Sequence, residues 1–446
     1  MELTKENLNK NIIKLALPAA MENILHMAVF IVDILIVGRL GTAPVAAVGL
    51  AGALSFIISM IFSALNVGTT ALVSRSIGAE EKIEAERVAG QSIFLSVILG
   101  LIISPSIFFF AEKFLVVMSA ELDVVELGTP YLRIISCFFI LRLIILTGSS
   151  IFRGAGDTRT PMVMTLIMNC VNIVFSWLLV FGIGFFPRLE VAGAAWGTSI
   201  AYIAGGSFIT YKLLNGKGIL TIRLKYVVDV NKDRILRMLR ISLPAMLDAF
   251  LTQIGYLFFM KIIAVLGTVA LAAHQIALRI EAISFMPGYA FAVATATLVG
   301  QSLGAGKIDL ARSSVKRNCL IALTVMGFFA IIFLTLAKPM SKLFHPEQEV
   351  LALSALCVMI AALEQPALAI YMVYAGGLRG AGDTLSLMII TIVGTLCFHL
   401  PVAYVFGIVL QWGLAGIWFG VALDWIFRSI AVYVIFRSGR WEKVKV

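Results

Sequence analysis

Residues 18–40 read PAAMENILHMAVFIVDILIVGRL, and this stretch decides the fold. It is apolar and long enough to span a bilayer, for which a helix needs about 20 residues. It also carries Glu22, His26 and Asp33, which share one helical face because a helix turns about 100° per residue. A charge at membrane depth costs roughly 2.5–3.5 kcal/mol on insertion scales. We therefore expect this face to look into protein or a wet cavity rather than into lipid.

The composition of the whole chain is that of a membrane protein. Of 446 residues, 60% are hydrophobic and only 13% are charged, against about 25% charged residues in soluble domains. The net charge of +10 does not indicate a nucleic-acid partner, because the basic residues lie between apolar runs and not in one patch. The five cysteines show neither metal spacing nor a paired framework. We expect an all-α polytopic protein in contact with the lipid bilayer.

The apolar runs predict twelve membrane-spanning helices in two six-helix lobes. We expect these spans at residues 12–38, 45–73, 90–111, 124–152, 160–182, 192–214, 238–265, 270–300, 315–337, 349–377, 386–408 and 414–436. The longest polar connection lies at 215–237 and is predicted to be a cytoplasmic linker between an N-terminal lobe, 1–214, and a C-terminal lobe, 238–446.

The basic residues predict the orientation of the chain. Twenty-five lysines and arginines fall in the segments on the side of the N-terminus, and five fall in the loops on the other side. Loops rich in lysine and arginine stay in the cytoplasm. We therefore expect both termini to be cytoplasmic, in a protein that crosses the inner (plasma) membrane many times.

The two halves of the sequence repeat at one constant offset. Pro18 falls on Pro244, and the hexapeptide RGAGDT at 153–158 falls on a second RGAGDT at 379–384, so the offset is 244 − 18 = 226. Both halves have six spans, so they share one orientation, and the repeat predicts a pseudo-two-fold axis along the membrane normal. The glycines of RGAGDT suit tight turns, and its aspartate suits the cap of the following helix. A phosphate site is not indicated, because GxxxxGK[ST] is absent.

Several stretches together resemble the multidrug and toxic compound extrusion (MATE) family of secondary transporters. They are VDILIVGRLG with AAVGLA, RGAGDTRTPM, VAGAAWGTSIA, LGTVALAAHQIALRIE, ATLVGQSLGAG and LRGAGDT. They recur in order over nearly the whole chain, and the stretch from LGTVALAAHQIALRIE to LGAG looks most similar to the DNA-damage-inducible branch. The resemblance implies antiport, in which inward flow of Na⁺ or H⁺ drives export of organic, often cationic, compounds, with no further cofactor.

The resemblance also implies an ion-coupling site in the N-terminal half. Asp33 matches the first-helix aspartate of that site, Asn172 the fifth-helix asparagine, and Thr198 the sixth-helix threonine. The archaeal-type pattern places an aspartate four residues after the asparagine, where this chain has Ser176. The seventh-helix glutamate of another branch falls near Gln253, which is not acidic.

Asp33 is the residue that we expect to bind the coupling ion. Intramembrane acids are functional by default, and the repeat mate of Asp33 is Phe259, so symmetry of the scaffold does not explain it. The alternative is a structural acid that hydrogen-bonds to neighbouring helices. Neutral oxygens of Asn172, Ser176 and Thr198 suit Na⁺, but one carboxylate also suits a proton, which we favour. Pro18 gives the helix a hinge.

The remaining acids each have two interpretations. Glu22 aligns with Asp248, and the pair are either relay or substrate-binding groups, or polar contacts that steady each half. His26 is either a proton relay or a hydrogen-bonding group. Glu281, Glu364 and Asp424 form either a structural network with Arg279 or a site for a substrate cation.

Three functions can be weighed for such a chain. The sequence favours an antiporter that exports organic cations or lipophilic drugs, which we expect to be monomeric. The alternative is an exporter or flippase of a lipid-linked or anionic metabolite on the same scaffold. A membrane enzyme is disfavoured, because the sequence has no HExxH, no nucleophile elbow and no paired metal spacing.

Overall fold

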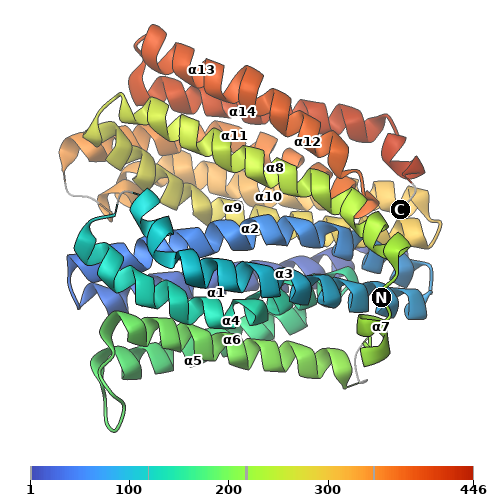
Figure 1. Cartoon of the computed structure of the whole chain (residues 1–446). Helices are drawn as coiled ribbons and strands as arrows, with labels where there is room; N and C mark the ends of the chain where they lie inside the picture. The colour runs from blue at the N-terminus through green and yellow to red at the C-terminus, as the bar shows by residue number, and fades with distance from the viewer. Residues whose placement is uncertain (1–2, 119, 216–218, 345–346, 445–446) are drawn as a thin grey trace. The chain divides into compact units, whose positions relative to one another are not determined.

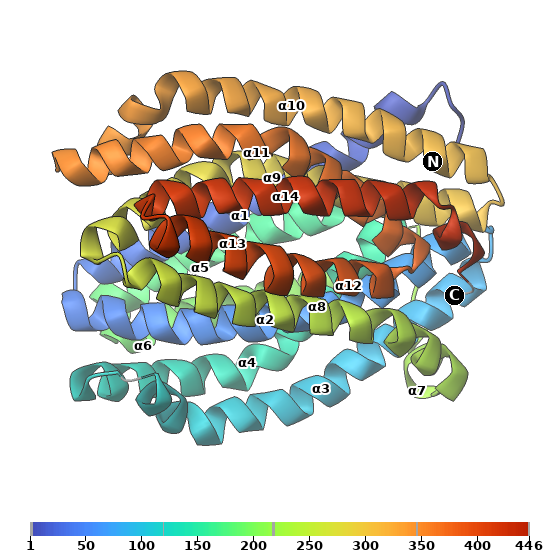
Figure 2. The same ribbon diagram turned by 90° about the horizontal axis from the view of Figure 1, so that it is seen from above.

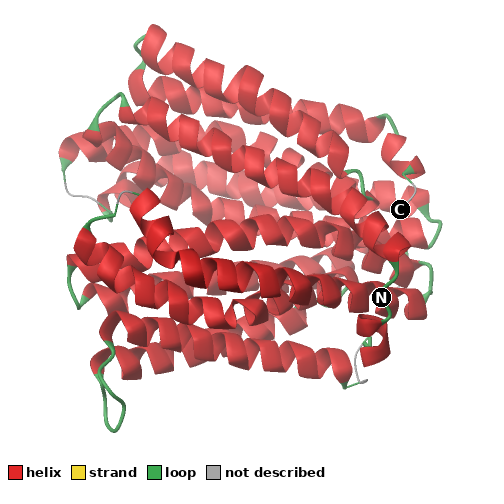
Figure 3. Cartoon of the chain, in the orientation of Figure 1, coloured by secondary structure: helices red, strands yellow, loops and turns green. Residues whose placement is uncertain are grey.

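The described residues fold entirely into helices and connecting loops. The computed structural model describes residues 3–118, 120–215, 219–344 and 347–444, and no strand occurs within them (Figure 3). The helices of the first half are α1 (Leu8–Gly38), α2 (Thr42–Gly78), α3 (Lys82–Val117), α4 (Leu122–Gly154), α5 (Arg159–Phe181), α6 (Glu190–Leu214) and the short α7 (Leu224–Val228). Those of the second half are α8 (Lys232–Ala264), α9 (Thr268–Gly304), α10 (Ile308–Lys342), α11 (Gln348–Ala381), α12 (Thr384–Val393), α13 (Leu400–Tyr404) and α14 (Gly413–Arg437).

Eleven of these helical segments are long and apolar enough to cross a membrane, counted over the described residues. One of them, Thr384–Val409, contains two π-helical segments: η1 (Gly394–His399) joins α12 to α13, and η2 (Val405–Val409) follows α13. The twelfth predicted span is α6, which has 25 residues. It does not reach the same hydropathy, because glycine, serine, threonine and tyrosine are frequent in it. The prediction of a polytopic helical protein is confirmed.

The helix boundaries carry the sequence repeat. Adding 226 to the numbers of both ends of α2, Thr42 and Gly78, gives the two ends of α9, Thr268 and Gly304. For α6 and α14 the corresponding offset is 223 at both ends. The difference of three arises just before these helices, because the loop from 182 to 189 is replaced by one from 410 to 412 that is five residues shorter, while the preceding helical segment ends two residues later, at 409 and not at 181 + 226 = 407. The predicted axis between the halves stays a prediction.

The chain divides into two compact units by its internal packing. The N unit is Met21–Met238, and the C unit comprises Met1–Ala20 together with Leu239–Val446. The chain therefore passes from one unit to the other inside α1, between Ala20 and Met21, and inside α8, between Met238 and Leu239. Of the predicted linker, residues 216–218 lie outside the described residues.

Each unit is built around one central helix. In the N unit α4 packs against α2, α3, α5 and α6, and α5 lies beside α6 (Figure 1). In the C unit α11 packs against α9, α10, α12 and α14, and it runs beside α10 along much of its length (Figure 2). The two central helices are counterparts in the repeat, and each ends in an RGAGDT turn.

The two RGAGDT turns have the same geometry. Gly156 and Gly382 both adopt φ of +87°, a left-handed conformation that favours glycine. Asp157 accepts hydrogen bonds from the backbone N–H groups of Arg159 and Thr160, both at 3.0 Å. Asp383 accepts one from the N–H of Ser386 at 3.2 Å. The predicted turn and cap are confirmed in both halves.

An ion pair fastens the first helix of each unit to its central helix. Arg153 Nη2 lies 2.6 Å from Glu22 Oε1, and the side chain of Glu22 is only 3% exposed. Arg379 Nη2 lies 3.7 Å from Asp248 Oδ2. The two pairs occupy matching positions of the repeat, since the offset of 226 relates both members of one pair to those of the other. Of the two interpretations of Glu22 and Asp248, this arrangement is the one in which they are polar contacts that steady each half.

The connection between α6 and α8 is held on α3. Gln91 of α3 donates to the carbonyl oxygens of Tyr226 and Asp229, at 2.8 and 2.9 Å, and accepts from the N–H of Asn231 at 3.0 Å. Gly90 makes room, because a Cβ there would stand 2.6 Å from the Tyr226 oxygen. The described part of this connection is therefore a fixed element of the N unit and not a loose tether.

Close helix packing at the RGAGDT turns gives the first prediction. A Cβ at Gly154 would stand 2.9 Å from the Thr70 carbonyl oxygen, and one at Gly380 would stand even closer to the oxygen of Ala296, the counterpart of Thr70. We expect Gly380→Ala to destabilise the protein by about 1–3 kcal/mol, as overpacking does, measured by denaturant unfolding in mixed micelles. The control is Gly327→Ala, which meets nothing within 4 Å and should stabilise α10 by about 0.5–1 kcal/mol. Equal behaviour of the two variants would contradict the packing.

The second prediction concerns the two ion pairs. Double-mutant cycles with Glu22→Gln and Arg153→Gln should give a coupling energy of roughly 1–3 kcal/mol, because breaking a buried pair leaves an uncompensated charge. The longer Asp248–Arg379 pair should couple more weakly. The control is Arg188–Glu190, whose side chains are 64% and 53% exposed and should couple least. A reversed order among the three cycles would refute the structural role of the Glu22 pair.

Candidate functional site

Asp33 stands on α1 in the N unit, within a cluster of polar residues from α4, α5 and α6 that we call the polar cluster. Its side chain is half-buried, and the buried Oδ1 has no hydrogen-bond partner among the described residues. Tyr131 of α4 and Tyr202 of α6 lie near enough to interact electrostatically with it. An acceptor oxygen left without a donor is costly inside a protein. The oxygen is therefore placed to take a proton or a cation.

Asn172 and Thr198 meet between α5 and α6, and Tyr131 connects them with Asp33. Asn172 Nδ2 donates to Thr198 Oγ1 at 3.1 Å, and the hydroxyl groups of Tyr131 and Thr198 share a hydrogen bond. Asn172 Oδ1 is buried and has no partner among the described residues. The polar set links α4, α5 and α6, and the electrostatic contact of Tyr131 with Asp33 links it to α1.

The contact of α5 with α6 is set by two glycines. A Cβ at Gly193 would stand 2.6 Å from the backbone of Leu179, and one at Gly197 would stand 2.6 Å from the backbone N of Ser176. Small residues four apart let helix backbones approach in this way. Ser176 is wholly buried against Gly197, and its hydroxyl finds no partner within the described chain.

Three residues of this polar cluster were not predicted from the sequence. Tyr131 and Tyr202 are uncharged at neutral pH, so the search for intramembrane charges passed over them. Arg142 lies inside α4, with its guanidinium 5.7 Å from the centre of the Tyr202 ring. It is an ionisable residue within a predicted span, and the rule that selected Asp33 would also have selected it.

Glu22 and His26 lie on the same helix below Asp33. Glu22 is buried in its pair with Arg153, and His26 Nε2 stands 3.9 Å from Glu22 Oε1 with a side chain 41% exposed. Asn169 of α5 donates to the backbone oxygen of Leu25 at 2.6 Å. That contact fixes α5 against α1 between the ion pair and Asp33.

Asp424 in the C unit is paired with Arg428 and His399. Arg428 Nε donates to both carboxylate oxygens of Asp424 at 2.9 Å, and His399 Nδ1 stands 3.0 Å from Oδ2. Arg279, the arginine of the predicted network alternative, is exposed, and the arginine that neutralises Asp424 is Arg428. The partner stands four residues along the same helix, where side chains meet on one face.

Three other predicted residues of the C unit are Glu364, Glu281 and Gln253. Glu364 is wholly buried on α11, and Glu281 on α9 is half-buried next to it. Gln253 is half-buried on α8. No cluster of three or more His, Cys, Asp or Glu that could hold a metal ion occurs in the described ranges.

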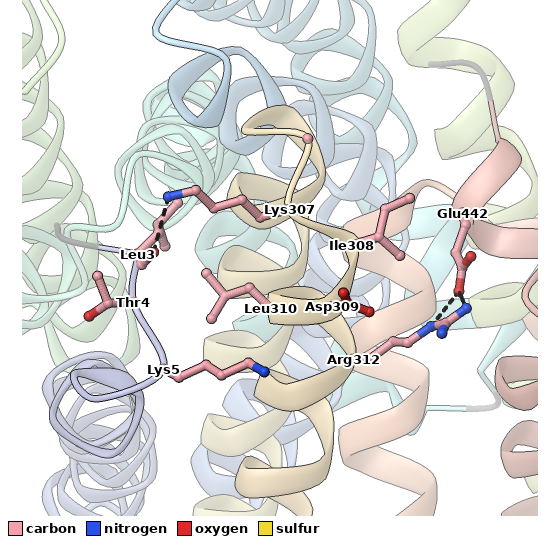
Figure 4. A pocket seen from close by; sticks show the side chains of 10 residues that line it. Leu3, Thr4, Lys5, Lys307, Ile308, Asp309, Leu310, Arg312 and Glu442 are labelled. Carbon is pink, nitrogen blue, oxygen red and sulfur yellow. Dashed lines mark hydrogen bonds and ion pairs between the residues drawn. The ribbon is translucent and has the colours of Figure 1, made fainter.

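A groove of about 720 Å³ in the C unit lies between the start of the chain and the beginning of α10 (Figure 4). Three of its charged side chains are engaged: Arg312 Nη2 stands 2.6 Å from Glu442 Oε1, and Lys307 Nζ donates to the Leu3 oxygen at 3.3 Å. This groove contains none of the predicted site residues.

Comparisons with known proteins agree on one family. The MatE family model matches residues 18–178 and 244–405, and both matches begin at the repeated proline. The "Probable multidrug resistance protein NorM" of Thermotoga maritima is 31% identical over 98% of this chain and 94% of its own. The "FAD transporter" of Shewanella oneidensis is 24% identical over 90% of this chain and 88% of its own.

A solved structure shares the fold. The "Crystal structure of MATE in the bent conformation" superposes with a TM-score of 0.90 and 24% identity, over 98% of this chain and 96% of that one. Together with the two family-model matches, this shows that the chain belongs to the MatE family of membrane transporters and has the MATE fold.

Proposed function

We propose that this chain is a multidrug exporter that expels organic, cationic or lipophilic compounds in exchange for an inward-moving ion. The observation that carries the proposal is the buried Oδ1 of Asp33, which lacks a partner among the described residues and lies near the tyrosines Tyr131 and Tyr202. The name of the Thermotoga maritima relative supports export of drugs. Membership of a transporter family supports it further.

The proposed coupling ion is a proton, with Na⁺ as the alternative. The proposed site has one carboxylate, that of Asp33, and the neutral oxygens of Asn172, Thr198 and Ser176. A single carboxylate with neutral oxygens needs only a proton to become neutral. Na⁺ would instead need several of those oxygens as ligands, at Asp33, Asn172 and Thr198.

Coupling also requires a movement that the ion can bias. An ion couples only if it changes the relative free energies of two states. Pro18 removes a backbone hydrogen bond inside α1, and it stands just before Met21, where the chain enters the N unit. We propose that neutralising Asp33 alters the free-energy cost of exposing the Asp33 face of α1 to lipid, protein or water. We further propose that α1 bends at Pro18 in response. A solved relative in a bent conformation supports such a movement.

The setting in the cell belongs to the same proposal. We place both termini in the cytoplasm, in the inner (plasma) membrane, because 25 of the lysines and arginines lie on their side. We assign the chain to the DNA-damage-inducible branch on the stretch LGTVALAAHQIALRIE. We take the working unit to be the monomer.

A second candidate is export of an anionic metabolite or a lipid-linked compound. The FAD transporter of Shewanella oneidensis supports it by name, and Arg142 places a positive charge inside α4. The two candidates differ in substrate charge. A lipophilic cationic dye and FAD, supplied in parallel to vesicles under the same gradient, separate them.

The third prediction tests Asp33. Asp33→Asn should fold and bind a lipophilic cationic dye, yet lose gradient-driven efflux, because asparagine keeps the shape but cannot exchange a proton or carry charge. Dye efflux from vesicles is measured with a proton gradient and an Na⁺ gradient imposed separately. The matched control is Glu126→Gln, an exposed acid of α4, which should export like the parent.

Each result decides part of the proposal. Efflux by Asp33→Asn equal to that of the parent under both gradients would exclude Asp33 as the coupling residue. Efflux by the parent under an Na⁺ gradient alone, and none under a proton gradient, would replace the proton by Na⁺. Transport of FAD without transport of the dye would favour the second candidate.

A further inference from the structure

The C unit holds two neighbouring acids, one wholly buried and one half-buried. Glu364 of α11 is wholly buried, and neither of its carboxyl oxygens has a donor among the described residues. The side chain within hydrogen-bonding reach of it is another acid, Glu281 of α9. A hydrogen bond between two carboxyl groups needs a proton on one of them, because two carboxylates have acceptors only.

No positive group among the described residues is left to neutralise both acids. From α14, Asp424 lies near enough to Glu364 to interact electrostatically with it, and Arg428 of α14 and His399 of η1 contact that Asp424. Arg428 is engaged by both oxygens of Asp424 and donates to Thr395 Oγ1 at 3.0 Å. On the helices that carry the two acids, Arg279 of α9 is exposed and Arg379 of α11 is paired with Asp248.

The neighbouring pair of Asp424 and Arg428 is itself held by a special backbone. The π-helical segment Gly394–His399 presents both Thr395 and His399 to α14. A Cβ at Gly394 would stand 2.8 Å from the guanidinium carbon of Arg428, so the glycine makes room for that group. π-helical turns are rare and occur frequently at functional sites.

The scaffold does not require these residues. At the offset of 226, Glu281 corresponds to Ser55 and Glu364 to Phe138. At the offset of 223, Asp424 corresponds to Ala201. The N unit therefore forms the same six-helix arrangement without any of the three acids, just as the C unit has Phe259 in place of Asp33. Buried acids that folding does not need point to ligand binding.

We propose that Glu281 and Glu364 together form a second proton-binding site in the C unit, in which the two carboxyl groups share one exchangeable proton. Removing that proton leaves two adjacent negative charges that are desolvated and unpaired. Repulsion between like charges at short range opposes this loss of the proton. The site goes beyond the proposed role of Asp33 and does not depend on it.

Infrared difference spectroscopy on the protein in lipid vesicles tests the site without transport. The parent should show the carbonyl stretch of a protonated carboxyl group at neutral pH, shifted by exchange into D₂O and lost at alkaline pH. Glu364→Gln should abolish this band, and Glu281→Gln should shift or abolish it. Asp33→Asn should leave it intact, which separates this site from the one proposed in the N unit. A band unchanged in both glutamate variants would overturn the proposal.

A second measurement does not depend on variants that fold. Dicyclohexylcarbodiimide reacts with protonated carboxyl groups in apolar surroundings, and mass spectrometry of the parent locates the label. We expect labelling on Glu281 or Glu364 at neutral pH and its loss at alkaline pH. Labelling of neither residue would refute the shared proton. Loss of the infrared band on adding Na⁺ at constant pH would show a metal-cation site and refute the assignment to a proton.

Discussion

A charge inside an apolar helix bundle persists only when an opposite charge or a proton offsets it. This constraint organises both units. Glu22 is offset by Arg153, and Asp248 by Arg379, so the first helix of each unit is fastened to the end of its central helix. Asp424 is offset by Arg428 and His399. Among the described acids at membrane depth, Asp33, Glu281 and Glu364 have no such cation against them and remain for ligand chemistry.

The repeat separates residues that serve the scaffold from residues that serve transport. Features present at both positions of the repeat are structural: the ion pairs, the left-handed glycines and the capping aspartates of RGAGDT. Features present in one half only are the polar cluster around Asp33 in the N unit and the acid pair in the C unit. A duplicated fold thus contains its own control, since each half shows what the other half does not need.

Much of the fold could be predicted from the sequence because it depends on local or repeated signals. Apolar runs predicted the spans, and the glycines and the aspartate of RGAGDT predicted the turn and the helix cap. Pairings between helices were harder, because hydropathy does not fix how each helix is rotated about its axis. The sequence suggested a network of Glu281, Glu364 and Asp424 with Arg279 without fixing its pairs, and the partner of Asp424 is Arg428, four residues away on the same helix. Tyr131 and Tyr202 gave no signal, because a neutral tyrosine in an apolar run is ordinary.

The division of α1 between the units has a consequence for the order of events during synthesis. Ile12, Leu15 and Ala16 belong to the core that also holds Leu298 and Phe436. Synthesis from Ile12 to Leu298 takes roughly 15–60 s at about 5–20 residues per second. The first helix to leave the ribosome therefore cannot complete its packing until much of the second half has been made. The N-terminal segment must wait in an unfinished state, and the nascent chain cannot fold strictly one half after the other.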